Sequence, residues 1–137
     1  MKKNIDGVKI IKKNVITDDR GKILHMIKND DDHFQKFGEI YFSYVNPSQI
    51  KAWHIHKEMT LNYVAAFGKI KLVLYDDRMA SSTNGIVQEI ILSNDNHFLV
   101  SIPPMIWNGF KAIVNQPAII ANCADQVHSE VEIERKD

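Results

Sequence analysis

The chain has few of the residues from which several common protein classes are built. Its 137 residues include one cysteine, Cys123, which excludes an intrachain disulfide and a cysteine-rich zinc site and is typical of a reducing compartment. Its 17 Lys and Arg residues balance 17 Asp and Glu residues, so the basic excess of a nucleic-acid-binding protein is missing. No stretch approaches the ~20 apolar residues of a membrane span, and the basic start has no signal-peptide-like apolar run. We therefore expect a cytoplasmic protein whose partners are neither nucleic acids nor membranes.

Length and composition are those of one ordinary globular domain. Hydrophobic residues make up 45% of the chain and charged residues 25%, which excludes a disordered or collagen-like protein. A chain of 15.7 kDa can bury a core without disulfides or a structural metal. No repeat, low-complexity tract or Pro/Gly/Ser-rich linker divides the sequence. We therefore expect a single domain over residues 1–137.

Short runs rich in Ile, Val, Tyr and Phe recur between turn residues, and this pattern is typical of strands. We expect strands over Val8–Ile11, Ile23–Ile27, Glu39–Val45, Lys51–His56, Leu61–Phe67, Lys69–Tyr75, Ile86–Leu92, Phe98–Ile102, Gly109–Val114 and Ala118–Ala121. Only residues 30–37 could form a short helix. Because crossover helices are missing, parallel α/β folds are excluded. The sequence predicts an all-β sandwich or barrel.

The densest polar cluster surrounds two histidines, His54 and His56. Successive side chains of a strand point to opposite faces, so these histidines share a face with Ala52. Trp53 and Ile55 then share the other face. We expect the histidine face to line a cavity and the Trp53 face to pack between the sheets.

Six short segments follow one another in a recognisable order. They are Asp18-Asp19-Arg20-Gly21, Ile50-Lys51-Ala52-Trp53-His54, Gly68–Arg78, Ser82-Thr83-Asn84-Gly85, Ile102–Phe110 and Asn122-Cys123-Ala124-Asp125. Together they resemble the sugar-nucleotide cupins related to dTDP-4-dehydrorhamnose 3,5-epimerase. The resemblance implies a double-stranded β-helix, the cupin jelly roll. It also implies a homodimer and a nucleotide-linked 4-keto sugar as ligand, in polysaccharide or deoxysugar synthesis.

The run His54-Ile55-His56-Lys57 also resembles the H-A-H-K motif of the cupin dTDP-4-keto-6-deoxyglucose 3,4-ketoisomerases. Both resemblances imply a base that removes the proton beside a ketone. Histidine suits this role because its pKa of about 6.5 lies near working pH. We expect His54 to be the base and His56 its orienting neighbour. The enolate needs a nearby cation, which Lys51 or Lys71 could supply, or Lys57 if it turns inward.

Three positions depart from the epimerase pattern. Asn108 stands where the family has a histidine, Leu61 where it has a lysine, and Ala121 where it has the tyrosine that acts as general acid. The acid must therefore come from elsewhere, and Tyr63 is the tyrosine closest in sequence to the histidine strand. The full set of candidates is Tyr41, Tyr44, Tyr63 and Tyr75.

Three further residues are expected to contact the ligand. Arg20 and Arg78 carry planar guanidinium groups that bind diphosphates bidentately, although each could instead pair with a neighbouring aspartate. Asn108 cannot take a proton, so we expect it to hydrogen-bond a sugar hydroxyl or the carbonyl oxygen. Alternatively, Asn108 caps the turn after Pro103-Pro104.

No metal and no cofactor are expected. Glu58 follows His56 too early to be the third ligand of a cupin metal site, and Asn108 replaces the histidine of the second motif. Two ligands of four make a weak transition-metal site. Three alternatives to the epimerase remain open, namely a non-catalytic sugar-nucleotide-binding cupin, a 3,4-ketoisomerase and a small metal-dependent cupin.

Overall fold

The structure is a computed structural model that describes residues 4–137. This part of the chain contains no helix, and so no helix long and apolar enough to cross a membrane. The strands are β1 (Lys9–Lys12), β2 (Val15–Asp18), β3 (Gly21–Leu24), β4 (Glu39–Val45), β5 (Ile50–His56), β6 (Leu61–Phe67), β7 (Ile70–Tyr75), β8 (Val87–Leu92), β9 (Phe98–Ile102), β10 (Trp107–Ala112), β11 (Ala118–Ala124) and β12 (Ile133–Arg135).

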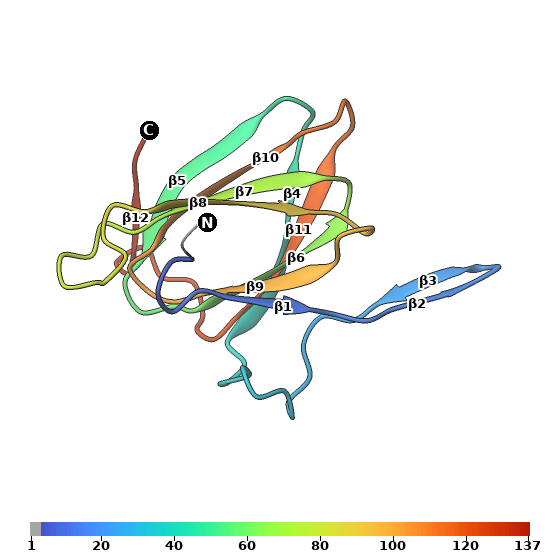
Figure 1. The fold of residues 1–137 in the computed structure, drawn as a ribbon, viewed down its shortest axis with the longest axis horizontal. Coiled ribbons are helices and arrows are strands. Elements are labelled where there is room, and N and C mark those ends of the chain that lie inside the picture. Colours follow the sequence, from blue (N-terminus) through green and yellow to red (C-terminus); the bar gives the residue numbers. More distant parts are fainter. Residues whose placement is uncertain (1–3) are drawn as a thin grey trace.

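Two five-stranded sheets face each other and enclose the core (Figure 1). The first has the order β1-β9-β6-β11-β4 and the second β12-β5-β10-β7-β8. All pairings within them are antiparallel, and most join strands that are distant in sequence. This arrangement is the double-stranded β-helix of a jelly roll and confirms the predicted fold class.

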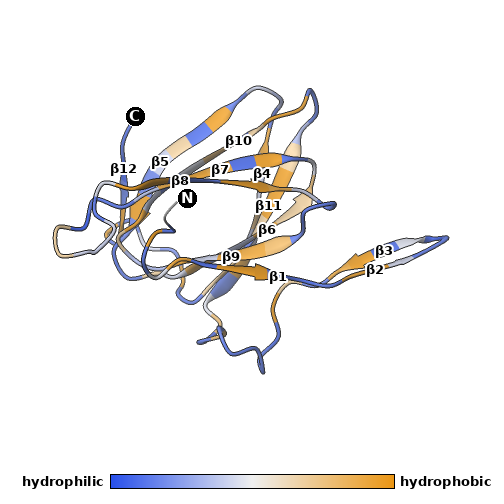
Figure 2. Ribbon diagram, viewed as in Figure 1, coloured by the Kyte–Doolittle hydropathy of each residue, from blue (hydrophilic) through white to orange (hydrophobic). Residues whose placement is uncertain are grey.

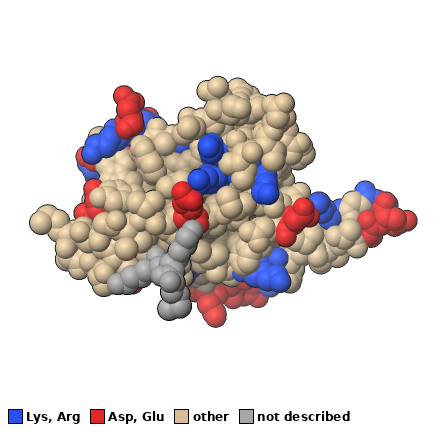
Figure 3. Space-filling model, turned by 45° about the horizontal axis from the view of Figure 1, so that its top comes forward, with Lys and Arg blue, Asp and Glu red and all other residues tan. Residues whose placement is uncertain are grey.

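The remaining two strands form a hairpin, here called the arm (residues 15–24), that projects from the barrel (Figure 1). Within the arm β2 pairs only with β3, from Val15 opposite Leu24 to Asp18 opposite Gly21. Acidic and basic side chains both occur on the arm, as on the rest of the face drawn in Figure 3. An isolated two-stranded hairpin is marginally stable in water, so the arm depends on contacts other than its own.

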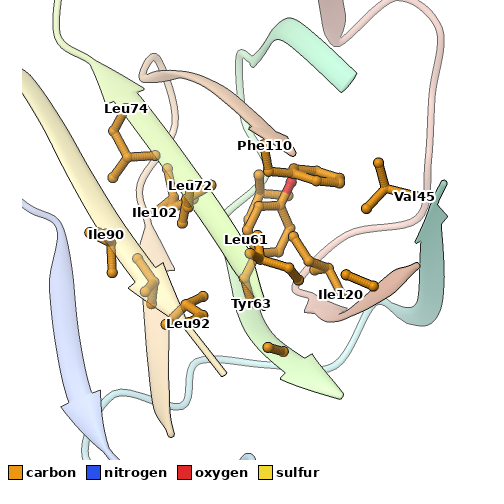
Figure 4. Packing of buried hydrophobic residues seen from close by; sticks show 14 of the residues in the cluster. Val45, Leu61, Tyr63, Leu72, Leu74, Ile90, Leu92, Ile102, Phe110 and Ile120 are labelled. Atoms are coloured by element: carbon orange, nitrogen blue, oxygen red, sulfur yellow. The ribbon is translucent and has the colours of Figure 1, made fainter. Parts of the chain in front are cut away.

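The core lies between the two sheets and follows the predicted alternation. Ile70, Leu72 and Leu74 on β7 are fully buried, whereas the residues between them are not. Figure 4 shows Leu72 and Leu74 among core side chains from both sheets, including Phe110 of the neighbouring strand β10 and Ile120 of β11 in the first sheet. The hydropathy colouring of Figure 2 shows the same alternation along the strands. Each such aliphatic side chain stabilises the fold by about 1.5–3 kcal/mol through burial.

The expected helix over residues 30–37 is wrong, because local side-chain hydrogen bonds replace a helical ladder. The Asp31 carboxylate accepts a hydrogen bond from the backbone N–H of Lys28 at 2.8 Å and pairs with Lys13 Nζ at 2.9 Å. The backbone forms separate tight turns there, such as Phe34 N–H to Asp31 C=O. Two short strands, β2 and β12, were not anticipated.

Strand β5 contains an irregularity that changes which side chains share a face. Asn108 of β10 pairs with His54, but Phe110 pairs with Lys51, so β5 carries one extra residue between the two pairs. The Ala52–Trp53 peptide bond within this bulge is cis. The bulge turns the Lys51 side chain to the inner face, where its Nζ donates to Ser43 Oγ of β4 at 3.1 Å.

The same bulge overturns two expectations. Ala52 does not share the histidine face, and Trp53 does not pack between the sheets. Both lie on the outer face of the second sheet, in a groove shared with Val73 and Gly109. The backbones approach closely there, because a Cβ on Gly109 would lie 2.5 Å from the Cβ of Ala52.

Candidate functional site

A cavity of about 360 Å³ opens where the edges of the two sheets meet. The edge strand β4 lines one side, and β5 with the edge strand β12 lines the other. The lining residues are Glu39, Tyr41, His54, His56, His128, Ile133 and Arg135. Both histidines of the H-x-H motif therefore lie in the pocket, as strand parity predicted.

His54 has the electrostatic properties of a general base. Burial chiefly lowers the pKa of His54 to about 4, and electrostatic interactions with His56, Arg135 and Lys51 add to this shift. The imidazole is therefore neutral at pH 7 and keeps an unprotonated ring nitrogen to accept a proton.

His56 is held by a buried carboxylate. Its Nδ1 is hydrogen-bonded to Glu132 Oε1, and Glu132 Oε2 accepts the backbone N–H groups of Glu58 and Met59 at 3.0 Å each. Burial opposes ionisation of Glu132, but these hydrogen bonds outweigh it and hold the pKa of Glu132 below its usual range. The rings of His54 and His56 lie edge to face with centroids 6.3 Å apart. Glu132 therefore fixes the orientation of the ring that packs beside His54.

Tyr63 and Asn108 lie below the pocket in the core rather than in its lining. The Tyr63 hydroxyl donates to Asn108 Oδ1 at 3.1 Å, and Asn108 Nδ2 donates to the His54 carbonyl at 3.3 Å. Both side chains are buried, and burial raises the pKa of Tyr63 well above its usual range. Asn108 neither caps a turn nor lines the pocket; it connects β6 to the strand that carries His54. The expected acid role of Tyr63 is not supported by this placement.

The three lysines predicted to stabilise the enolate lie on different faces of the protein. Lys51 lies on the inner face, and its charge contributes to lowering the pKa of His54. Lys71 points to the outer face, lines the groove beside Trp53, and pairs with Glu89 at 3.2 Å. Lys57 is exposed and pairs with Glu134 at 3.5 Å. Lys71 and Lys57 are therefore wrong as pocket residues, because strand parity directs both away from the cavity.

The two arginines predicted to bind the diphosphate also lie outside the histidine pocket. Arg20 is exposed near the tip of the arm and donates to the Asp18 carboxylate at 2.7 Å. Arg78 is engaged by the fully buried Asp76 through Nε and Nη2, both at 2.9 Å. For both residues the ion-pair alternative describes this chain, and neither reaches the histidine pocket within it.

Sequence reasoning missed two residues of the site near the C-terminal end of the described chain, Arg135 in the pocket lining and the buried Glu132 behind His56. Arg135 pairs in register with His54 and lines the pocket, while its Nη1 donates to Glu130 at 3.1 Å. Glu132 is 76 residues away from the histidine that it binds. The alternation Val131-Glu132-Ile133-Glu134 is typical of a strand and is the signal that could have located this segment. In residues 4–137, no group of three or more His, Cys, Asp and Glu side chains is placed to hold a metal ion.

Comparison with known proteins places this geometry among sugar-nucleotide enzymes. A sequence profile of the dTDP-4-dehydrorhamnose 3,5-epimerase family matches residues 2–137. A probable low-salt glycan biosynthesis epimerase of Haloferax volcanii is 32% identical over 121 residues, which cover 87% of this chain and 78% of that protein.

Solved structures show the same likeness. The crystal structure of a dTDP sugar isomerase from Desulfovibrio desulfuricans G20 superposes with a TM-score of 0.95 at 40% identity, covering 97% of this chain and 85% of that one. A 3,5-epimerase from Legionella pneumophila, crystallised in complex with dTDP-4-keto-L-rhamnose, shares the fold with a TM-score of 0.85 at 20% identity, covering 98% and 75%.

Proposed function

The chain belongs to the dTDP-4-dehydrorhamnose 3,5-epimerase family, and from that premise we propose that His54 removes the proton beside the ketone of a nucleotide-linked 4-keto sugar. The observation that carries the proposal is a neutral imidazole in an open cavity, held beside a histidine that a buried carboxylate orients. A positioned general base of this kind accelerates proton transfer by about 10²–10⁴-fold.

Two cations near His54 have complementary roles in this proposal. Lys51 lies on the inner face near His54 and stabilises the enolate oxygen that forms when the proton leaves. Arg135 lines the pocket with one guanidinium nitrogen bonded to Glu130, so its other donors are available to the diphosphate. The dTDP-linked sugar bound by the Legionella relative supports a nucleotide sugar as the ligand.

A panel of dTDP- and GDP-linked 4-keto sugars in deuterated water tests the reaction. We expect deuterium to enter at the carbon beside the ketone, together with inversion there, as followed by NMR. Movement of the carbonyl to a neighbouring carbon would identify a 3,4-ketoisomerase instead. Binding without exchange of any member would identify a non-catalytic sugar-nucleotide-binding protein.

We further propose that the chain works as a homodimer. The arm exposes Ile16 and Ile23, and the edge strand β4 exposes Ile40, Phe42 and Tyr44 on its outer face. Exposed apolar residues on an edge strand are normally covered, and a second copy of the chain could cover both surfaces. The arm would then extend onto its partner and carry Arg20 away from its own barrel.

Light scattering at micromolar concentration tests the dimer. The expected mass is twice that of one chain, and replacing Phe42 by Glu is expected to reduce it toward 15.7 kDa. A single-chain mass for the unaltered protein would contradict the proposal.

A further inference from the structure

Tyr41 faces His54 across the pocket from the opposite sheet. It lies on β4 of the first sheet, whereas His54 lies on β5 of the second, and both line the same cavity. Tyr41 is 38% exposed, so its side chain is open to a ligand in a way that the fully buried Tyr63 is not. A sugar ring in this cavity would therefore meet His54 on one side and Tyr41 on the other.

A buried amide lies beside the Tyr41 hydroxyl. Asn122 of β11 is the cross-strand partner of Tyr41 and is fully buried. Its Oδ1 accepts the backbone N–H of Asn62 at 3.0 Å, but its Nδ2 makes no direct hydrogen bond within residues 4–137. The Asn122 side chain nevertheless acts to lower the pKa of Tyr41, so it favours the ionised phenolate that remains after a proton has been given away.

The surroundings keep this hydroxyl protonated at neutral pH. Burial raises the pKa of Tyr41, the Asn122 amide opposes that rise, and the carboxylates of Glu39 and Glu132 add to it. Tyr41 therefore holds a proton that it can donate, next to a group that stabilises the product of donation.

The other tyrosines do not share this position. The Tyr63 hydroxyl is committed to Asn108 in the core. Tyr75 lines a groove on the outer face with Trp53 and Trp107. Tyr44 is exposed and pairs with Ile119, outside the pocket.

We propose that Tyr41 is the proton donor of this chain and delivers its hydroxyl proton to the carbon on the face away from His54. The inference rests on the proposed epimerase function and assigns the acid that Ala121 cannot provide. Ala121 packs on the outer side of the first sheet against Val64 and Leu99, so that position does not face the pocket.

The proton balance of the step is closed. His54 takes the α-proton, and the electrons of the C–H bond form the enolate. The enolate carbon then takes the proton of Tyr41 on the opposite face, which restores the ketone with inverted configuration. This leaves an imidazolium and a phenolate, and proton exchange with solvent returns both to their starting states. No oxidant or reductant is needed.

The test compares inversion with isotope exchange in Tyr41→Phe. With the panel member that the unaltered protein converts, we expect inversion to fall by about 10²-fold or more. Deuterium should still enter from solvent with retained configuration, because His54 can return the proton from its own side. Tyr41→Met, which also lacks the hydroxyl, should separate inversion from exchange in the same way. Tyr75→Phe, in the outer groove of the second sheet, is the matched control and should change neither rate.

Each other result has a defined meaning. Inversion at the normal rate in folded Tyr41→Phe or Tyr41→Met would overturn the assignment while leaving the proposed function intact. Equal loss of inversion and exchange in both variants would overturn the donor role, since Tyr41 would then be needed for abstraction itself. If the unaltered protein neither exchanges nor inverts any panel member, the proposed function fails and the assignment fails with it.

Discussion

Replacing His54 by asparagine is expected to reduce both inversion and solvent-deuterium exchange by about 10²–10⁴-fold, because asparagine cannot accept a proton. In the unaltered protein, kcat/KM should depend on a group with a pKa of about 4. A base must be unprotonated to act, so activity should be constant from above this pH to neutral pH and fall as the pH drops through about 4. A pH series of kcat/KM, with circular dichroism at each pH to verify folding, measures this.

His25→Asn is the control for this substitution, because His25 lies at the base of the arm and not in the histidine pocket. It should leave exchange unchanged. Exchange that persists in His54→Asn would contradict the assignment of the base and would point to His56, the other imidazole of the pocket.

Replacing Asp76 by alanine is expected to destabilise the fold by about 3–5 kcal/mol. This is the usual cost of removing one partner of a buried ion pair and leaving the other charge unpaired. Asp76 is fully buried and accepts hydrogen bonds from Arg78, Ser81 and Thr83. The same cluster holds the N-terminal segment, because Thr83 accepts the Asp6 N–H and Arg78 donates to the Asp6 carbonyl. Urea unfolding measures the loss, and the exposed Asp95→Ala is the matched control.

The contacts of Asp76 also determine how the free energy of unfolding changes with pH. The hydrogen bond from Arg78 chiefly holds the pKa of Asp76 well below its usual range. A depressed folded-state pKa adds stability above the unfolded-state pKa of about 3.9, and this stability is lost as the pH falls toward the folded-state value. Unfolding free energy should therefore decline below about pH 4, less steeply in Asp76→Asn. Equal slopes in both proteins would show that other carboxylates govern acid unfolding.

Strand parity predicted much of the fold and the central pair of the site. The alternation of Ile70, Leu72 and Leu74 identified an inner face, and the H-x-H spacing placed His54 and His56 together in the pocket. These features depend on the period of a strand, which is local in sequence.

Features that depend on distant contacts could not be derived in this way. The bulge in β5 is a property of its pairing with β10, and it brings Lys51 to the face of His54 although parity alone separates them. The carboxylate that orients His56 comes from Glu132, far along the chain. Arg78 was equally compatible with phosphate and with an ion pair until the burial of Asp76 was known.

The close approach of β10 to β5 has a consequence for redesigning the pocket. A methyl group on Gly109 would overlap that of Ala52, so even alanine at this position would push apart the strand of His54 and the strand of Asn108. Libraries built to change sugar preference should therefore keep residue 109 as glycine and diversify the rim at Glu39 and His128 instead. The contact between Gly109 and Ala52 on the outer face of the barrel thus limits which substitutions the pocket strands can accept.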